Sequence, residues 1–355
     1  MQHLWTILIA IFVFGLIIGI HEFGHFLAAK LNGIQVNEFS IGMGPKLLQK
    51  QKGETLYTLR LLPIGGFCAM EGEEDASDNP RAFDRKPVWR RMIVIVAGAA
   101  MNILLGFVLI AVTTVENDIV PTLTIRSFHE TTTNSGETIS MASSQQDGLQ
   151  VGDRILSLDG SHVFSTTDFA YQLQMAEKTD FSIKVKRDGK IINLEHVTFQ
   201  DQETGDLIDF RLKGEKPNPI NTIAYAAKDT VATSKLIWMS LVDLISGKFS
   251  VQDMSGPVGV VSVIDQAATA GKTIGEKLSS VASLTVFITI NIGVFNMLPI
   301  PGLDGSRFVF LLLEAIRRKP VKKEHEALVH FVGMACLFLF MIFITIQDVT
   351  KFFVK

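Results

Sequence analysis

The chain has 355 residues, of which 47 % are hydrophobic and only 19 % are charged, and its mean hydropathy is +0.31. Soluble domains carry about 25 % charged residues, so this composition argues against a simple soluble protein, and a net charge of −3 without a basic stripe argues against a nucleic-acid partner. The two cysteines, Cys68 and Cys336, exclude a disulfide framework and a thiolate zinc site, so a metal would need His, Asp or Glu ligands.

Four stretches without Asp, Glu, Lys or Arg are each about 20 residues long, which is enough to cross a bilayer as a helix. They are residues 1–20, 92–115, 281–303 and 327–347. The first has no Lys or Arg ahead of its apolar run, so we interpret it as a retained transmembrane helix rather than a cleaved signal peptide. The predicted fold class is a polytopic α-helical membrane protein with about four transmembrane helices.

The end of the first stretch carries His21-Glu22-Phe23-Gly24-His25. Histidines at positions i and i+4 lie on one face of a helix and can bind one metal ion, and Glu22 lies beside that face, close enough to act on a water molecule there. The ordinary alternative is a pair of hydrogen-bonded histidines at the membrane interface. An ionisable cluster in an apolar helix costs about 2.5 to 3.5 kcal/mol per central charge unless it is paired, and metal coordination supplies that pairing.

Lys and Arg gather in the two short loops, residues 30–91 and 317–323, and are absent before the first span. The positive-inside rule therefore predicts that both loops are cytoplasmic and that both chain ends and the long segment 116–280 are extracytoplasmic. The first loop also has strand character, because residues 35–41 and 55–62 can pair across a turn near Gly53.

The long segment begins with the pattern of a small αβ domain. Residues 152–160 alternate in polarity and end in a turn, and strands at 181–185 and 191–194 flank a hairpin signal. A short helix is predicted at 165–176, and residues 127–146 form a polar insertion. Residues 222–245 predict a helix that either lies on the membrane surface or packs on this domain, and the sequence leaves both open.

The third apolar stretch ends in a turn that carries a carboxylate, within residues 296–305. Pro299 and Pro301 would break a helix there, and the topology puts Asp304 at the same depth as His21 and His25. A catalytic zinc site needs three protein ligands, and Asp304 is the candidate for the third. The alternative is an ordinary turn with a solvated aspartate. Weaker rivals for the third ligand are His325, His330 and Asp348.

These motifs together resemble the site-2 proteases, intramembrane zinc metalloproteases, and among them the bacterial RseP/RasP-type branch with a single PDZ domain. The features that carry the resemblance are the His21 to His25 motif, Gly42-Met43-Gly44-Pro45, Pro63-Ile64-Gly65-Gly66-Phe67, Gly148 to Leu156, and Asn296 to Gly305 with its Leu303-Asp304-Gly305. They follow one another in the family's order along nearly the whole chain.

The resemblance implies a role for each matching residue. His21, His25 and Asp304 match the family's zinc ligands, and Glu22 matches its catalytic glutamate. The candidate substrate-binding residues are Asn296, Gly42, Met43, Gly44, Pro299 and Pro301, and Asn102 in the second span is a candidate to support the ligands. The resemblance further implies a membrane-associated β-hairpin around Gly42 and an extracytoplasmic PDZ-like domain that either captures peptide or acts as a size filter.

Four regions are therefore expected. Residues 1–115 contain the first two spans, the zinc-binding motif and the β-loop, and residues 116–200 form the PDZ-like domain. Residues 201–280 form a connector with an amphipathic membrane-surface helix, and residues 281–355 contain the last two spans with the Leu303-Asp304-Gly305 motif.

The expected activity is hydrolysis of peptide bonds within or next to transmembrane segments, in a cell-membrane enzyme with its active site toward the cytoplasm. The resemblance implies single-pass substrates trimmed beforehand on the extracytoplasmic side, namely anti-sigma factors, signal-peptide remnants or peptide-pheromone precursors. Three rival interpretations remain: a membrane-anchored zinc protease with a cytoplasmic active site, an ion or metal transporter, and a PDZ-type scaffold.

Overall fold

The computed structural model describes residues 2–73, 77–129, 131–132, 138–140, 142–176, 178–199, 208–248 and 256–353. The chain divides into two compact units, residues 1–106 with 240–355, and residues 107–239. The divisions fall inside two helices, α2 (Val88–Glu116) and α5 (Pro219–Ile245). Each unit is described by itself below.

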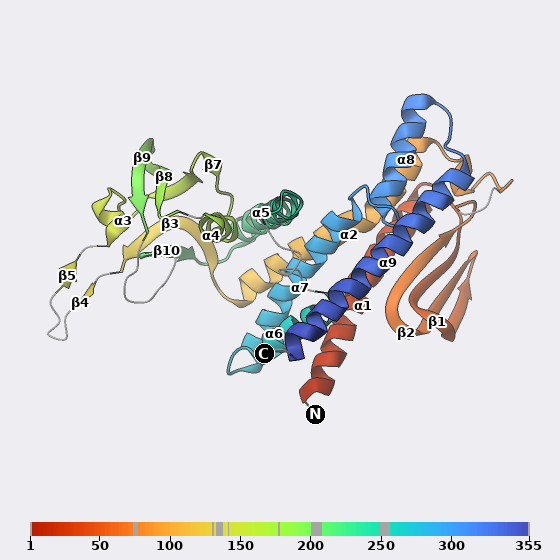
Figure 1. The fold of residues 1–355 in the computed structure, drawn as a ribbon, viewed down its shortest axis with the longest axis horizontal. Helices are drawn as coiled ribbons and strands as arrows, with labels where there is room; N and C mark the ends of the chain where they lie inside the picture. Colours follow the sequence, from red (N-terminus) through yellow and green to blue (C-terminus); the bar gives the residue numbers. More distant parts are fainter. Residues whose placement is uncertain are drawn as a thin grey trace. The chain divides into compact units, whose positions relative to one another are not determined.

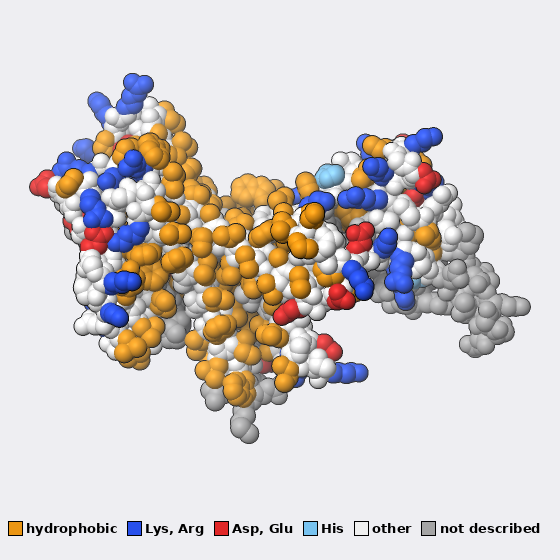
Figure 2. Space-filling model, turned by 180° about the vertical axis from the view of Figure 1, so that it is seen from behind, with side chains coloured by type: hydrophobic (Ala, Val, Ile, Leu, Met, Phe, Trp, Pro, Cys, Tyr) orange, Lys and Arg blue, Asp and Glu red, His pale blue; other side chains and the backbone are white. Residues whose placement is uncertain are grey.

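The first unit is built on long apolar helices, which are α1 (Gln2–Leu31), α2, α7 (Ile274–Asn296) and α9 (Lys323–Phe353) (Figure 1). Within the described residues, four segments are long and apolar enough to span a membrane: Trp5–Leu31, Val88–Glu116, Ile274–Asn296 and Glu324–Lys351. Many apolar side chains of these helices are exposed, among them Trp5, Phe12, Phe331 and Phe338, and apolar side chains gather over the middle of the face that Figure 2 shows. The expectation of about four transmembrane helices is confirmed, and the chain has the character of a multi-pass membrane protein.

Small residues let α1, α2 and α7 approach one another closely. A Cβ atom on Gly24 of α1 would lie 2.4 Å from the carbonyl oxygen of Ala97 in α2, and one on Gly293 of α7 would lie 3.0 Å from that of Ala99. Lipid tails are as apolar as these helix surfaces, so moving the surfaces from lipid into a helix contact gains little free energy. Close backbone contacts of this kind are therefore a main source of helix association in a membrane.

The third span begins and ends seven residues earlier than the predicted stretch 281–303. Helix α7 ends at Asn296, and the prolines at 299 and 301 fall in the turn that follows. A separate helix, α8 (Asp304–Arg317), then begins, and Arg91 of α2 forms an ion pair with Glu314 of α8. A helix at 304–317 was not predicted, because the sequence analysis placed a turn at 296–305 and assigned no element after it.

Helix α6 (Pro257–Thr269) was also not predicted. It joins α1 through a hydrogen bond from Thr6 to Asp265, and it joins α9 because the backbone N–H of Gly259 donates to Asp348 over 2.8 Å.

The β-structure of the first unit consists of β1 (Val36–Lys52) and β2 (Thr55–Met70), which bend so that each contributes two rows. Residues 46–52 pair with 55–60 across the turn, whereas residues 36–41 lie between the two halves of β2. The predicted pairing of 35–41 with 55–62 is present, but it is not the pairing across the turn. Residue numbers rise in the same direction along both segments, from Glu38 opposite Leu56 to Ile41 opposite Leu59. Residues 66–70 form an outer row of this sheet. The loop after β2 contains the short helix η1 (Phe83–Arg85).

The second unit is a small αβ domain whose sheet extends past residue 200, where the domain was expected to end, because β10 pairs with β3. Its sheet has the order β10-β3-β6-β8-β9, with β7 beside β6. The strands are β3 (Val120–Phe128), β6 (Arg154–Leu158), β7 (Ser161–His162), β8 (Asp180–Arg187), β9 (Lys190–Thr198) and β10 (Phe210–Glu215). Phe169 of α4 (Thr166–Met175) and Phe210 are among the fully buried side chains of its core. The hairpin between β8 and β9 turns at Asp188 and Gly189, both with positive φ.

The predicted polar insertion, residues 127–146, lies partly outside the described residues, because 130, 133–137 and 141 are not described. Its described part contains the end of β3, the paired strands β4 (Thr131–Thr132) and β5 (Thr138–Ser140), and helix α3 (Ser143–Gln146).

Helix α5 packs on the αβ domain through polar contacts with the start of α4. The Lys235 ammonium lies 3.3 Å from the buried Asp168 carboxylate, and Asp229 accepts hydrogen bonds from Ser165 and Thr167. Burial raises the pKa of Asp229. These contacts correspond to the alternative in which this helix packs on the domain. Its outer face still exposes Ile223, Val231 and Trp238, so contact with a membrane surface stays a prediction.

Candidate metal centre and active site

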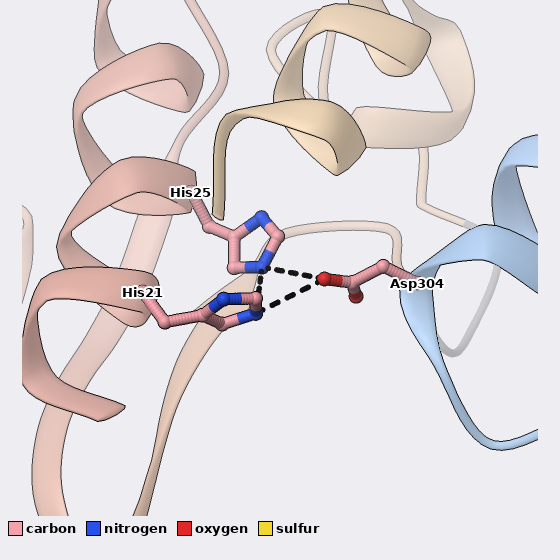
Figure 3. Close-up of side chains that lie close together, drawn as sticks. All are labelled: His21, His25 and Asp304. Atoms are coloured by element: carbon pink, nitrogen blue, oxygen red, sulfur yellow. Dashed lines mark hydrogen bonds and ion pairs between the residues drawn. The ribbon is translucent and has the colours of Figure 1, made fainter. Parts of the chain in front are cut away.

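The paired histidines lie on α1, one helical turn apart, and both are buried. Their Nε2 atoms are 3.1 Å apart, and the ring centroids are 4.8 Å apart with the rings nearly perpendicular. The i, i+4 spacing, which suggested that the two histidines bind one metal ion, therefore brings both imidazoles together (Figure 3).

Asp304 reaches the same point from the start of α8, 283 positions along the chain from His21. Its Oδ2 lies 3.0 Å from His21 Nε2 and 3.2 Å from His25 Nε2 (Figure 3). In the described part of the chain these three residues are the group whose ligand atoms all lie within 4.8 Å of one another. Burial raises the pKa of the Asp304 carboxyl, but the hydrogen bonds with the two histidines lower it more, so its pKa lies below the usual range.

The hydrogen bond at the outer nitrogen of His25 fixes which ring nitrogen faces the other two ligand candidates. His25 Nδ1 lies 2.8 Å from the carbonyl oxygen of Val94, which can only accept, so Nδ1 carries the proton. The Nε2 of a neutral His25 is then an unprotonated acceptor that faces a carboxylate oxygen. Ligand atoms around a tetrahedral zinc ion stand about 3.3 Å apart, close to the three separations here, so the donor set fits zinc.

His21 is held by Asn102 of α2, whose side chain is fully buried. The Asn102 amide nitrogen lies 3.3 Å from His21 Nδ1, and the amide oxygen has no partner among the described residues. A metal bound at Nε2 requires a proton on Nδ1, and Nδ1–H needs an acceptor. Rotating the Asn102 side-chain amide by 180° supplies that acceptor, because its oxygen then takes the place of its nitrogen beside His21 Nδ1.

Gly98 of α2 leaves the space in which the imidazoles sit. A Cβ atom at this position would lie 2.4 Å from His25 Nε2 and 2.8 Å from His21 Cε1. Neither ring can move far, because each is hydrogen-bonded at its outer nitrogen. Any side chain at position 98 would therefore occupy space that the ligand atoms need.

Glu22 lies beside the ligands and outside their cluster, as the helical spacing predicts. Its Cγ would be 3.2 Å from a Cβ on Gly66, so the absence of a side chain at Gly66 lets β2 pass directly over Glu22. Glu22, His21, His25 and Asp304 all line a cavity of about 750 Å³. Glu22 therefore has access to the same space as the ligand atoms.

The same cavity is lined by residues that the sequence reading did not single out. They include Phe67 to Met70, which belong to the outer row of β2, and three charged residues, Glu71, Glu73 and Arg307. Arg307 forms an ion pair with Glu73, and it follows Asp304 by three positions, on the same face of α8. That spacing is the only sequence signal that could have found it.

The candidate substrate-binding residues are not brought to this cavity. Gly42, Met43 and Gly44 lie where β1 bends, and Met43 pairs with Leu62. Asn296, Pro299 and Pro301 lie at the end of α7 and in the turn before α8, and are not among the residues that line the cavity.

The rival third ligands lie elsewhere. His330 accepts a hydrogen bond from the backbone N–H of Gly302, and Asp348 accepts one from Gly259. Neither of them, nor His325, belongs to the His21 cluster. Asp304 is the carboxylate that meets the two histidines.

Comparison with known proteins agrees with this arrangement. The family model described as Peptidase family M50 matches residues 9–340. A protein of Clostridium acetobutylicum that carries the provisional name of a zinc metalloprotease is 36 % identical over 349 residues, 97 % of each chain. A similarly named protein of Fusobacterium nucleatum is 36 % identical over 357 residues, 98 % of this chain and 99 % of the relative.

The protein named regulator of sigma-W protease RasP, from Bacillus subtilis, is 29 % identical over 433 aligned positions, which cover 98 % of this chain and 99 % of the relative. The family match covers most of the sequence, and the similarity to the first two relatives extends over nearly the full length of both chains. The chain belongs to peptidase family M50, the site-2 proteases, and is a zinc metallopeptidase.

Proposed function

We propose that this metallopeptidase cuts peptide bonds within or next to transmembrane segments of single-pass membrane proteins, after an earlier cut has removed most of their extracytoplasmic part. The observation that carries the proposal is the meeting of His21, His25 and Asp304 on candidate membrane-spanning helix α1 and at the start of α8. A hydrolytic centre attached to a membrane span can reach bonds that a soluble protease cannot.

His21, His25 and Asp304 are the proposed zinc ligands. Zinc bound there would polarise the scissile carbonyl and make water a better nucleophile at neutral pH. Asn102 and the Val94 carbonyl orient the imidazoles, so that Nε2 of each ring faces the ligand point.

Glu22 is the proposed general base and acid. Its carboxylate takes a proton from the attacking water and later gives a proton to the amine that leaves. The position next to His21, in the same cavity as the ligands, supports this role.

The outer row of β2 is the proposed docking edge for substrate. A helical substrate hides its carbonyls in hydrogen bonds, so it must unwind before it can be attacked, and an added strand would satisfy the exposed backbone groups. Residues 67–70 line the cavity, which favours this edge over Gly42, Met43 and Gly44. Asn296, Pro299 and Pro301 are retained as candidates that shape the approach to the site.

The αβ domain of the second unit is proposed to be PDZ-like and to act as a size filter. The positive-inside rule supports a cytoplasmic position for the basic loops and an extracytoplasmic one for this domain. A folded domain on that side would exclude substrates that keep a large ectodomain.

The proposed substrates are anti-sigma factors, signal-peptide remnants or peptide-pheromone precursors. The name of the Bacillus subtilis relative, a regulator of sigma-W, favours the first of these. An anti-sigma factor would be a single-pass protein whose cytoplasmic part is released by the cut.

Cleavage of a model transmembrane peptide by the purified protein in detergent tests the proposal. We expect the peptide to be cut inside or at the edge of its apolar segment, as located by mass spectrometry, and a chelator to abolish the cut. Glu22→Gln should keep its zinc and lower the rate by about 10²- to 10⁴-fold.

Cuts confined to the soluble flanks of the peptide would instead favour a membrane-anchored protease. Zinc transport into vesicles without any hydrolysis would favour a transporter.

A further inference from the structure

One of the carboxylates that line the cavity, Glu71, is held by neutral donors alone among the described residues. Glu71 accepts a hydrogen bond from Ser77 over 2.6 Å and one from Asn37 over 2.7 Å, and both donors are neutral. Glu73, two residues on, is neutralised by its ion pair with Arg307. Across the described residues, Glu71 has no ion-pair partner of its own.

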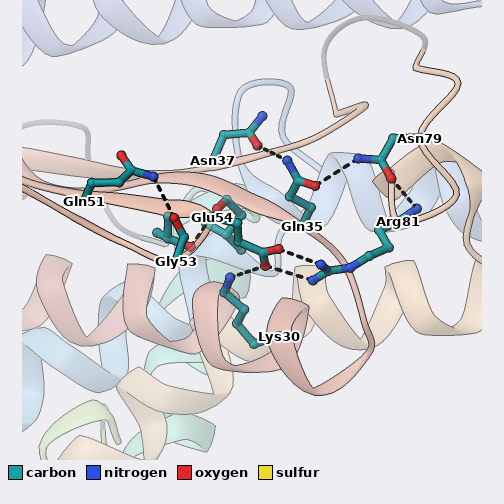
Figure 4. A network of polar contacts seen from close by, with 10 residues as sticks. Lys30, Gln35, Asn37, Gln51, Gly53, Glu54, Asn79 and Arg81 are labelled. Atoms are coloured by element: carbon teal, nitrogen blue, oxygen red, sulfur yellow. Dashed lines mark hydrogen bonds and ion pairs between the residues drawn. The ribbon is translucent and has the colours of Figure 1, made fainter.

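A network of hydrogen bonds fixes Glu71 in this position. The Gln35 amide donates a hydrogen bond to Asn37, and the Asn79 amide donates one to Gln35 (Figure 4). These two hydrogen bonds fix the position of the Asn37 side chain that donates to Glu71. The Glu71 backbone is also fixed, because its N–H donates to Gln35 and its carbonyl accepts from Phe83. Glu71 is therefore a rigid feature of the cavity wall and not a mobile loop carboxylate.

The charge of Glu71 is maintained at neutral pH. Hydrogen bonds from Ser77 and Asn37 lower the pKa of its carboxyl. An ionised, partly exposed carboxylate in a cavity is attractive to a cation on the molecule that enters it, more than the same charge on an open surface would be.

The position of Glu71 along the chain suggests which part of a substrate it would meet. Gly66 lies next to Glu22, and residues 67–70, which line the cavity, continue β2 from there to Glu71. A strand added along these residues would carry its scissile bond near the ligands and a residue a few positions away near Glu71. In the proposed orientation this is the cytoplasmic end of the substrate, where membrane proteins concentrate Lys and Arg.

We propose that Glu71 is a specificity-determining residue that binds a juxtamembrane Lys or Arg of the substrate, on the cytoplasmic side of the cut. The inference rests on the proposed function and adds the substrate feature that sets the position of cleavage. Glu71 acts on binding and does not take part in the proton transfers assigned to Glu22.

A set of transmembrane peptides that differ only in one flanking residue tests this. Lys, Gln or Glu is placed at successive positions beyond the apolar segment, and kcat and KM are measured with the full-length protein. We expect Lys to lower KM relative to Gln on the order of tenfold at one position. Glu71→Gln should remove that preference, so that KM for the Lys peptide rises to the value for the Gln peptide, and Glu71→Lys should make the Glu peptide the better substrate.

Asp78→Asn is the matched control, because Asp78 is an exposed carboxylate of the same loop that pairs with Arg85 and does not line the cavity. The control should keep the full preference for Lys. A Lys preference that survives Glu71→Gln, or that the wild-type protein lacks, would overturn the inference. Chelator-sensitive cleavage of the Gln peptide reports on the protease itself, so its absence would count against the proposed function instead.

Discussion

At the scale of single residues, the two imidazoles of the centre are oriented by unlike partners. His25 donates to the Val94 carbonyl, a backbone acceptor that no substitution removes, whereas His21 depends on the side chain of Asn102. The Asn102 backbone is itself fixed, because the Thr289 hydroxyl donates to its carbonyl over 3.0 Å. The orientation of His21 is therefore the part of the site most open to change by mutation.

Replacing Asn102 with Ala should lower zinc affinity by about 10- to 100-fold, because the Nδ1–H of His21 loses its acceptor. Asn102→Asp keeps an acceptor at the same place and should retain most of the affinity. Competition with a zinc chelator measures both. Equal affinities for wild type and both variants would mean that Asn102 does not hold His21.

Gly98→Ala should empty the centre, because the new methyl group would overlap both imidazoles. The strain of such overpacking is typically about 1 to 3 kcal/mol, and here it falls on the ligand atoms. Gly19→Ala is the control, since a Cβ on Gly19 of α1 meets nothing within 4 Å. Metal analysis of both purified variants should find zinc lost only from Gly98→Ala, and full occupancy in both would contradict the packing argument.

At the scale of elements, the turn between β1 and β2 is tied back to the helices by one carboxylate. Glu54 accepts two hydrogen bonds from Arg81, over 2.6 and 2.8 Å, and one from Lys30 at the end of α1 (Figure 4). These hydrogen bonds lower the pKa of Glu54 to about 2. A bidentate arginine pair with a second cation holds a geometry better than an isolated surface pair.

The attachment of this turn should depend on pH in one direction. Because the folded pKa lies below the ordinary value of 4.5, the contribution is complete above that pH and is lost as the pH falls toward 2. Hydrogen exchange of residues 46–60 in detergent should therefore speed up between pH 6 and pH 3, after correction for intrinsic rates. Glu54→Gln should exchange faster at pH 6 and respond less to acid. Identical exchange in the variant and the wild type at both pH values would exclude this role.

Elements whose residues carry a local turn or capping pattern were predictable from the sequence. Elements that depend on contacts with distant segments of the chain were not. The β8–β9 hairpin followed from its turn residues, and the cap of α4 is Ser165, where the helix was expected to begin. The second row of β2 could not be foreseen, because pairing of 66–70 with 36–41 depends on a bend in β1. Helix α8 was not foreseen, because the prolines marked the end of the third span without showing that a new helix follows.

At the scale of the whole molecule, the proposed size filter predicts a gain of activity. Removing residues 120–215, the strands β3 to β10, and closing the gap with a short flexible linker should let the protein cut substrates that keep their ectodomain. The measurement is cleavage of matched long and trimmed substrates in vesicles. Cleavage of the trimmed substrate by the same variant shows that the centre is intact, and continued resistance of the long one would end the filter hypothesis.

The sequence located the candidate metal centre more fully than it located the surroundings of that site. The helical spacing joined His21 to His25, and span depth brought in Asp304, because a membrane limits each residue to a narrow layer. The parts that depend on packing between distant segments, such as the Val94 carbonyl, the space at Gly98 and the Glu73–Arg307 ion pair, carry no local signal.

X-ray absorption at the zinc edge, recorded on the purified full-length protein, tests the central claim most directly. Two imidazole nitrogens and a carboxylate oxygen predict a first shell of nitrogen and oxygen at about 2.0 to 2.2 Å, with imidazole scattering behind it. A sulfur shell at about 2.3 Å would contradict the account, because it would assign the ion to a cysteine such as Cys68, which lines the same cavity.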